Sequence, residues 1–579
     1  MMTERYDAII VGLGAAGGII AEQLTQAGLH VLAIEKGPDH SPEDFAVTQD
    51  EMRYYQRGSQ LATVDVDPVT WRPNSTASAR LLPWSTGPFG GHEPNFGLSS
   101  TGTGGGTLHG SGASYRFRES DFCMRSTIIE RFGAAALPEG STLADWPISY
   151  ADLEPYYDRV EHEQGVSGRG GNVRGVVEEG GNPFDPFRTR DYPMPPIPQA
   201  PGDVAFVAAT TRLGLHPFRQ PVAANSVEYH GRPACLNCGF CHGYPCHVGA
   251  KASTAFTSIP AAQVTGNLEL RALCRVLRIT RTANGKQVRG VTYLDSSGEE
   301  REATARSVIL SAYALQNVRL LLISGINAAQ QVGQNFMTHN FGRFTSVLPE
   351  ATNPFMGSAV ASSAVDDFTS ELIPDNDVGV LWGSPIMSKA GDLHPIEAYH
   401  LMDRRVRKIG LDFKHWMREN YRFIHRMSSQ TTSFPHPQYF CDLDPRLKDR
   451  WGQPALRITH DWTEHDANSV SLFGRYKAHI AREMGSTDYW MDSPRPAYHL
   501  STHDVGVHRM GENPATSVTD AYGEVHGCAG LYAVGGGSFV SYGGYAPTET
   551  IQALAYLCAD HLLEDYAASM AQQGRNDSV

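Results

Sequence analysis

The first 36 residues alternate between short apolar runs and one helical pattern. Residues 6–11 form an apolar run that is rich in β-branched side chains, and residues 19–27 repeat apolar side chains with helical periodicity. A second apolar run, residues 29–34, ends in Glu35. The order predicts a strand, a tight turn, a helix and a second strand.

Similar patterns recur later in the chain. Residues 268–277, 288–293 and 307–311 have the composition of strands, and Asn284-Gly285 and Ser297-Gly298 have that of turns. Two further segments, residues 314–323 before Gly325 and residues 548–568, have helical patterns. Strands that alternate with helices predict an α/β fold.

The turn after the first strand has the sequence Gly12-Leu13-Gly14-Ala15-Ala16-Gly17. Glycines at this spacing permit a tight turn and let the backbone approach a pyrophosphate, whose charge is stabilised at the helix N-terminus. An acidic residue at the end of the second strand can bind the ribose hydroxyls of an adenosine. The pattern predicts a dinucleotide site, although a glycine-rich turn in an ordinary α/β protein is the alternative. Its residues would be Gly12, Gly14, Ala15, Ala16, Gly17, Glu35 and Lys36.

Composition narrows the classes of function. With 41% hydrophobic and 19% charged residues the chain is typical of globular proteins. The net charge of −14 argues against a nucleic-acid partner, and no apolar run has the ~20 residues that a membrane span needs. The first strand begins within a few residues of Met1, which leaves no room for a signal peptide. We expect a cytoplasmic protein, with folded export alongside a signal-bearing partner as the alternative.

Four of the nine cysteines lie together in a C-x2-C-x2-C-x4-C pattern. They are Cys235, Cys238, Cys241 and Cys246. Thiolates at this spacing can converge on one metal centre, and the bacterial ferredoxin run is similarly compact. A zinc site usually has two separated pairs of ligands. The pattern favours an iron–sulfur cluster over reduced thiols or a disulfide, with zinc the least favoured.

Four segments, in order, resemble the glucose-methanol-choline (GMC) family of flavin oxidoreductases. They are the GxGxxG turn with Glu35, the Gly104-Gly105-Gly106 run leading to Tyr115-Arg116-Phe117, residues 311–339 ending in His339, and residues 503–548. The likeness covers nearly the whole chain and is nearest to the bacterial sugar branch, which includes gluconate, fructose and glucoside dehydrogenases and pyranose oxidases. It implies FAD and a Rossmann-type FAD-binding domain with a discontinuous α+β substrate-binding domain. The implied FAD-binding parts are residues 1–130, 231–340 with the cysteine-rich loop, and 499–579 with the catalytic segment; the substrate-binding parts are residues 131–230 and 341–498.

The resemblance also implies roles for individual residues. His503, five residues before the His508-Arg509-Met510-Gly511 run, matches the family's catalytic base. The family usually has a second His or Asn where this chain has Ala546, so substrate orientation must come from elsewhere. Tyr545 is one candidate, and a residue of the block 340–498 is another. His109 matches the histidine that carries the covalent flavin bond in pyranose oxidases, although a histidine packed beside the flavin is favoured here. The further cofactor residues would be Gly104, Gly105, Gly106, Thr107, His109, Gly536, Ala546, Pro547 and Thr548.

Together these features predict an FAD-dependent dehydrogenase for a hydroxyl group of a sugar or glycoside. An oxygen-using oxidase of the same class of substrates, including aminosugars, is the nearest alternative. A flavin-binding subunit without turnover is a further alternative, favoured only by Ala546. The resembling dehydrogenases often have a small partner subunit or a separate electron acceptor.

Overall fold

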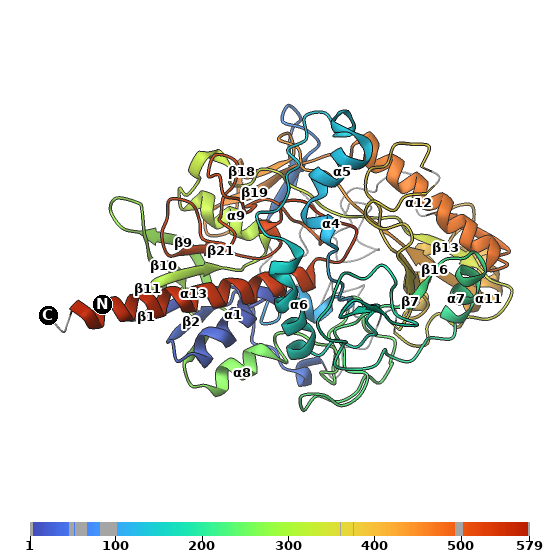
Figure 1. The fold of residues 1–579 in the computed structure, drawn as a ribbon, viewed down its shortest axis with the longest axis horizontal. Helices are drawn as coiled ribbons and strands as arrows, with labels where there is room; N and C mark the ends of the chain where they lie inside the picture. The colour runs from blue at the N-terminus through green and yellow to red at the C-terminus, as the bar shows by residue number, and fades with distance from the viewer. Residues whose placement is uncertain are drawn as a thin grey trace.

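The structure is a computed structural model in which two large sheets lie at opposite ends of the molecule (Figure 1). No described helix is both long enough and apolar enough to cross a membrane. The described residues are 4–45, 51, 67–81, 101–358, 361–374, 376–491 and 502–576.

The first sheet has the strand order β8-β2-β1-β11-β10-β9, and β21 also pairs with β11. Strands β8, β2, β1, β11 and β21 are parallel, whereas β10 and β9 are antiparallel. The long strand β11 pairs with β10 along its first half and with β21 along its second half. The strands are β1 (Glu4–Val11), β2 (Val31–Ile34), β8 (Leu268–Arg271), β9 (Arg275–Arg281), β10 (Val288–Leu294), β11 (Glu300–Leu310) and β21 (Leu531–Ala533).

Helices from both ends of the chain pack beside this sheet. Helix α1 (Ala15–Gln26) packs against α8 (Ser258–Val264) and against the C-terminal helix α13 (Thr548–Asn576), which in turn contacts α6 (Tyr150–Gln164). In Figure 1 the blue α1 and the red α13 lie side by side. Helix α9 (Ala314–Ile323) instead contacts strand β9 and two strands of a smaller sheet, β18 and β19. The first and last segments of the chain therefore share one core.

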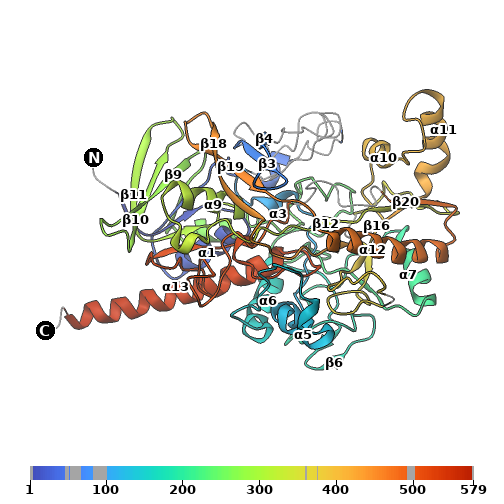
Figure 2. The same ribbon diagram turned by 90° about the horizontal axis from the view of Figure 1, so that it is seen from above.

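The second large sheet is antiparallel throughout, with the order β20-β13-β16-β15-β14-β7. Helices α7 (Asp203–Arg212) and α12 (Glu464–Glu483) pack on it and on each other. Figure 2 shows this sheet and α12 at the end of the molecule away from the C-terminus. The strands are β7 (Pro217–Arg219), β13 (Phe344–Val347), β14 (Ser363–Val365), β15 (Ile386–Lys389), β16 (Ile424–Ser428) and β20 (Asp488–Met491).

A four-stranded sheet of order β18-β19-β3-β4 contains strands from distant parts of the sequence. Its strands β3 and β4 come from the predicted residues 1–130 and its other two from the predicted residues 341–498, so the division into two domains stays a prediction. The other α-helices and strands lie outside the two large sheets and the helices packed on them. They are β3 (Val69–Arg72), β4 (Arg80–Leu81), β5 (Asn172–Val173), β6 (Val176–Val177), β12 (Asn340–Phe341), β17 (Gln430–Thr431), β18 (Phe440–Lys448), β19 (Pro454–Thr459), α3 (Gly106–His109), α4 (Glu119–Phe122), α5 (Met124–Phe132), α10 (Pro395–Leu401) and α11 (Gly410–Asn420).

The sequence prediction of one strand over residues 268–277 is wrong. The segment forms two strands, β8 and β9, that pair with opposite ends of the sheet. Leu273, between them, has a φ of 57°, in the left-handed region that turns usually assign to glycine. Its amide donates to the Gly37 carbonyl at 2.9 Å, and that of Cys274 donates to the Glu35 carbonyl at 3.0 Å. Contacts with a distant loop hold this turn, so its local sequence does not mark it.

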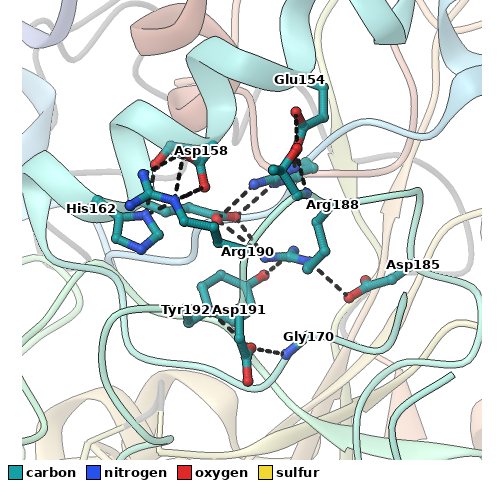
Figure 3. A network of polar contacts seen from close by, with 12 residues as sticks. Glu154, Asp158, His162, Gly170, Asp185, Arg188, Arg190, Asp191 and Tyr192 are labelled. Carbon is teal, nitrogen blue, oxygen red and sulfur yellow. Dashed lines mark hydrogen bonds and ion pairs between the residues drawn. The ribbon is translucent and has the colours of Figure 1, made fainter. Parts of the chain in front are cut away.

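A buried network of charges fixes α6 against the segment around Arg188 (Figure 3). Glu161 is fully buried and accepts hydrogen bonds from Arg116 at 2.8 Å and from Arg188 at 3.1 Å. Burial acts to raise the pKa of Glu161, but the two guanidinium groups outweigh it and the pKa is lowered. The carboxylate therefore stays ionised and is shared by two buried cations, which also contact Glu154 and Asp185.

Glu161→Gln tests the contribution of this network to stability. Glutamine keeps the size of the side chain but removes the one carboxylate that both buried guanidinium groups share, and leaves each with a single carboxylate partner, Glu154 or Asp185. We therefore expect a loss of about 3–5 kcal/mol in the free energy of unfolding. Arg190→Gln is the matched control, because Arg190 is 51% exposed in its ion pair with Asp158 and should contribute less than about 1 kcal/mol. Urea unfolding of both variants measures the difference, and equal losses would contradict the assignment.

Candidate active site

A cavity of about 550 Å³ runs between the first sheet and the second. One end is lined by the turns that follow β1 and β2, and the other by strands β13, β15 and β16. His503 and the segment 546–548 line it as well. Residues from the beginning, the middle and the end of the chain therefore meet around one space.

The glycine turn after β1 is shaped by close contacts with the end of β11. Gly12 has a φ of 89°, and a Cβ there would lie 2.7 Å from the Cα of Ala312. A Cβ on Gly17 would lie 2.1 Å from the Gly12 carbonyl oxygen and 2.5 Å from Oγ of Ser311, which donates to that same carbonyl at 2.6 Å. These glycines let α1 begin directly at the sheet edge, so its free backbone N–H groups face the cavity.

Glu35 holds three loops together at the same end of the cavity. Its carboxylate accepts hydrogen bonds from the amides of Leu13 at 3.0 Å, Gly37 at 2.9 Å and Gly102 at 3.0 Å. A carboxylate offers about four acceptor positions, so capacity for a ribose hydroxyl remains. Glu35 thus positions the loops in addition to lining the site.

The second glycine run packs directly against the first. The Gly104 amide donates to the Leu13 carbonyl at 2.7 Å, and a Cβ on Gly105 would lie 3.0 Å from the Cα of Gly14. The cavity lining includes fourteen of the predicted cofactor residues. They are Gly12, Gly14, Ala15, Ala16, Glu35, Lys36, Gly105, Gly106, Thr107, His109, Gly536, Ala546, Pro547 and Thr548, whereas Gly17 and Gly104 lie behind it. An elongated space with glycine turns and a helix N-terminus at one end fits a dinucleotide.

His503 is joined to a second histidine, His339. Nδ1 of His503 lies 3.1 Å from Nδ1 of His339, whose Nε2 lies 2.7 Å from the Gly543 carbonyl oxygen. Because a carbonyl only accepts, Nε2 of His339 carries a proton and its Nδ1 is the acceptor. Nδ1–H of His503 therefore donates, and the lone pair of the neutral ring lies on Nε2.

Both rings are neutral near pH 7. Burial and then the Lys389 ammonium lower the pKa of His503 to about 4. Burial and the neighbouring His503 lower the pKa of His339 well below its usual value. A neutral imidazole on the cavity wall, with its tautomer fixed by a second ring, can accept a proton. In the sequence, His339 is recognisable only as the end of a family segment, and nothing there predicts its contact with His503.

The structure does not bring Tyr545 to this cavity. The Tyr545 hydroxyl donates to Asp366 at 2.9 Å, and its ring stacks on that of Tyr115 with the centroids 5.4 Å apart. Ala546 lines the cavity in its place. The expectation that Tyr545 orients a substrate is therefore not supported.

The four clustered cysteines line a small second cavity, and the structure has no disulfide among the described residues. Backbone amides donate to two of their sulfurs, from Asn237 to Cys235 at 3.3 Å and from Lys251 to Cys246 at 3.5 Å. Within the described ranges, however, no three His, Cys, Asp or Glu side chains are arranged to hold a metal ion. The thiols are thus gathered, but not as a finished metal site.

The cysteine loop is tied to the wall of the main cavity. Nζ of Lys251 donates to the carbonyls of Gly110, Cys241 and Tyr244 at 2.7–2.8 Å. The Gly243 amide donates to the His109 carbonyl at 2.8 Å. The loop therefore lies directly behind the helix that carries His109.

Family models of GMC oxidoreductases match residues 142–341 and 440–555 of this chain. The chain belongs to the GMC oxidoreductase family. It is 32% identical to the gluconate 2-dehydrogenase flavoprotein of Pantoea cypripedii over 97% of this chain and 94% of that protein. It is 28% identical to the paromamine 6'-oxidase of Streptomyces fradiae, over 97% and 92%, and 25% identical to the fructose dehydrogenase large subunit of Gluconobacter japonicus, over 97% and 98%.

Solved structures confirm the GMC fold. Pyridoxine 4-oxidase of Mesorbium loti matches with a TM-score of 0.60 at 16% identity, covering 96% of this chain and 99% of that chain. A formate oxidase variant of Aspergillus oryzae matches with a TM-score of 0.60 at 14% identity, covering 98% and 99%. The family membership makes this GMC protein an FAD-dependent oxidoreductase, as the sequence motifs predicted.

The role of the glycine turn in this GMC fold can be tested with two alanine variants. Gly12 and Gly28 have φ values of 89° and 87°, so alanine causes similar backbone strain at both. Only Gly12 is crowded, since a Cβ on Gly28 would meet no atom within 4 Å. We expect Gly12→Ala to lose bound FAD and Gly28→Ala to retain it. The ratio of flavin to protein absorbance measures this, and full FAD retention by Gly12→Ala would contradict the role of close packing.

Proposed function

We propose that this GMC oxidoreductase oxidises a hydroxyl group of a sugar or glycoside to a carbonyl, with His503 as the base. The observation that carries the proposal is the His503–His339 pair, in which a neutral His503 is held through its Nδ1 and lines the cavity that the glycine turns also line. The names of the relatives support a sugar, since gluconate, fructose and paromamine derivatives are carbohydrates.

In this proposal the protein's own groups position the substrate and move one proton. Nε2 of His503 accepts the proton of the substrate hydroxyl, while the hydrogen bond from its Nδ1 to His339 keeps the ring in one orientation. His339 is held in turn by the Gly543 carbonyl. FAD, when bound by the glycine turns, supplies the acceptor for the hydride of the same carbon.

The proposal has two versions, which differ in the molecule that receives the electrons from the reduced flavin. The four thiols of the cysteine loop fit an iron–sulfur cluster by their chemistry, and a cluster there would accept electrons one at a time. We propose this version, a dehydrogenase with a separate acceptor or a small partner subunit, in which the loop closes around the cluster. The alternative is an oxidase that reduces oxygen to hydrogen peroxide, as the name of the relative paromamine 6'-oxidase implies for that protein.

The proposed reaction can be tested by anaerobic titration of the purified holoprotein with sugars and glycosides. Bleaching of the flavin absorbance by one of them, with formation of its carbonyl product, is the expected result. A flavin that dithionite reduces and no sugar or glycoside does would contradict the substrate class.

Substitution of the two histidines tests their roles. We expect His503→Ala to lower kcat by about 10²–10⁴-fold with FAD retained, because the proton acceptor is lost. His339→Leu should lower kcat less and alter its pH profile, whereas His339→Asn, which keeps an acceptor, should restore part of the activity. His561→Gln is the control, since His561 is partly exposed on α13 and does not line the cavity. Equal activity of His503→Ala and the parent protein would exclude His503 as the base.

The same assignment predicts a dependence on pH. His503 must be neutral to act as a base, and its pKa is about 4. We therefore expect kcat/KM to be constant from neutral pH down to about pH 5 and to fall as protonation proceeds below it. Measuring kcat/KM of the parent enzyme and of His339→Asn from neutral pH to below pH 5 checks this prediction.

Metal analysis tests the role of the cysteine loop. Protein purified without oxygen should contain iron and acid-labile sulfide, and Cys238→Ser should reduce both. Cys123→Ser is the matched control, because Cys123 is also exposed but lies outside the loop. Iron-free active enzyme that produces hydrogen peroxide with oxygen would establish the oxidase version.

A further inference from the structure

The far end of the main cavity is walled by one face of the second sheet. Lys389 on β15 and Thr345 on β13 are the direct neighbours of Arg426 on the central strand β16. Arg343, two residues before Thr345, lines the same cavity. Three cationic side chains from three segments of the chain therefore share one wall.

This arrangement breaks a rule of strand pairing. Lys389 and Arg426 are paired across antiparallel strands, where like charges are destabilising. Such local conflicts between charge and fold are expected where a site serves function. A bound group of opposite charge would remove the conflict.

The surrounding protein neutralises only part of this charge. Arg426 donates to Glu397 at 3.0 Å and to the Gly391 carbonyl at 2.7 Å, but its buried Nε has no hydrogen-bond partner. Within the described ranges, the side chains of Lys389 and Arg343 make no hydrogen bond or ion pair, and they retain their capacity to donate.

The other nearby carboxyl adds little negative charge. Asp392 accepts a hydrogen bond from the His242 amide at 3.0 Å. Burial and then the neighbouring Glu397 raise the pKa of Asp392, which favours its protonated form. Burial and the Arg426 charge lower the pKa of Lys389 to about 8, which leaves its ammonium form in excess at neutral pH.

Among the described residues that line this end of the cavity, Glu397 is then the carboxylate beside three cations, and the wall carries a net positive charge. Glu51, which accepts hydrogen bonds from the amides of Ile396 and Glu397, does not line the cavity.

The cationic wall adjoins the reacting end of the site. Lys389 and His503 both line the cavity, and the Lys389 charge acts on the His503 ring. A substrate that presents a hydroxyl to His503 would therefore bring its other end within reach of Lys389, Arg343 and Arg426. The guanidinium fork and the ammonium suit a carboxylate, with which they form charge-assisted hydrogen bonds.

We propose that Arg343, Lys389 and Arg426 form a subsite for the carboxylate of an acidic sugar, an aldonate or a uronate, whose hydroxyl is oxidised at His503. The inference rests on the proposed function and names its substrate class. Cationic aminosugars are disfavoured because they would place a further positive charge on this wall. A monoanion fits better than a phosphate dianion, which Glu397 would repel.

The test compares substrates that differ in charge on the FAD-containing enzyme. D-Gluconate and D-glucuronate are compared with neutral D-glucitol and D-glucose, with cationic D-glucosamine and with glucose 6-phosphate, as kcat and KM at fixed ionic strength. We expect kcat/KM to be at least about tenfold higher for one of the acids, mainly through KM, as for a charge-assisted hydrogen bond. Equal values for acids and neutral sugars, or a preference for glucosamine or the phosphate, would overturn the carboxylate assignment.

Variants separate a charge effect from a structural one. Lys389→Met and Arg343→Gln should each raise KM for the acid by about tenfold or more, and should change KM for the neutral sugar much less. Lys389→Arg should restore most of the loss, and the surface variant Arg190→Gln should have no effect. Arg343 is exposed, so Arg343→Gln remains informative if Lys389→Met does not fold. Equal losses for acid and neutral sugar would overturn the proposal.

The binding of the acid can be measured apart from turnover. D-Gluconate added to the oxidised enzyme should perturb the flavin absorbance, with a Kd about tenfold weaker in Arg343→Gln. If no sugar reduces the flavin but D-gluconate binds in this way, the proposed reaction fails and the carboxylate subsite stands. If D-gluconate and D-glucuronate neither bind nor react, the subsite is overturned.

Discussion

The site depends on the parallel pairing of β1 with β11, in which Ile10 lies beside Ile309. Parallel strands end at the same edge of a sheet, and this pairing places Gly12 next to Ser311 and Ala312. Strand β21 pairs with β11 in parallel and ends at the same edge of the sheet. The chain that follows β21 therefore lines the cavity at Gly536 and at residues 546–548. A pairing between remote parts of the chain therefore creates the cavity, and the glycines allow the backbones to meet without a clash.

The structure contains two buried charge networks that differ in how far their charges are balanced. Around Glu161, one carboxylate faces two guanidinium groups at hydrogen-bonding distance, and further carboxylates from Glu154 and Asp185 complete the balance (Figure 3). At the cavity wall, Lys389 and Arg426 are neighbours on paired strands, and Glu397 forms an ion pair with Arg426 only. The first arrangement has its counter-charges built in and fixes the fold. The second is complete only with a ligand of opposite charge, which is why the two networks suggest different roles.

Motifs that are local in sequence could be recognised before the structure was considered. The glycine turn, Glu35 and His503 each lie in short segments whose spacing is set by a tight turn or a family pattern, and all line the cavity. Tyr545 was a candidate for substrate orientation because of its place beside Ala546, but its hydroxyl donates to Asp366 and its side chain does not line the cavity. His339 was recognised only as part of a family segment and had no role assigned. The block 340–498 was a candidate for substrate orientation, but nothing local in the sequence singled out Arg343, Lys389 and Arg426 within it. The turn at Leu273 was missed for a similar reason, as contacts with residues 35–37 hold it.

The sequence by itself determined the class of the protein: a dinucleotide turn, the helices at residues 314–323 and near the C-terminus, and a histidine in the place of a base. These follow from local backbone chemistry, in which glycine spacing and hydrophobic periodicity act over a few residues. Only the tertiary structure decided the tautomer of His503 and the charge of the cavity wall. Both depend on atoms that are far apart in the chain and meet in a desolvated space, where a single carbonyl or ammonium group sets where protons and charges reside.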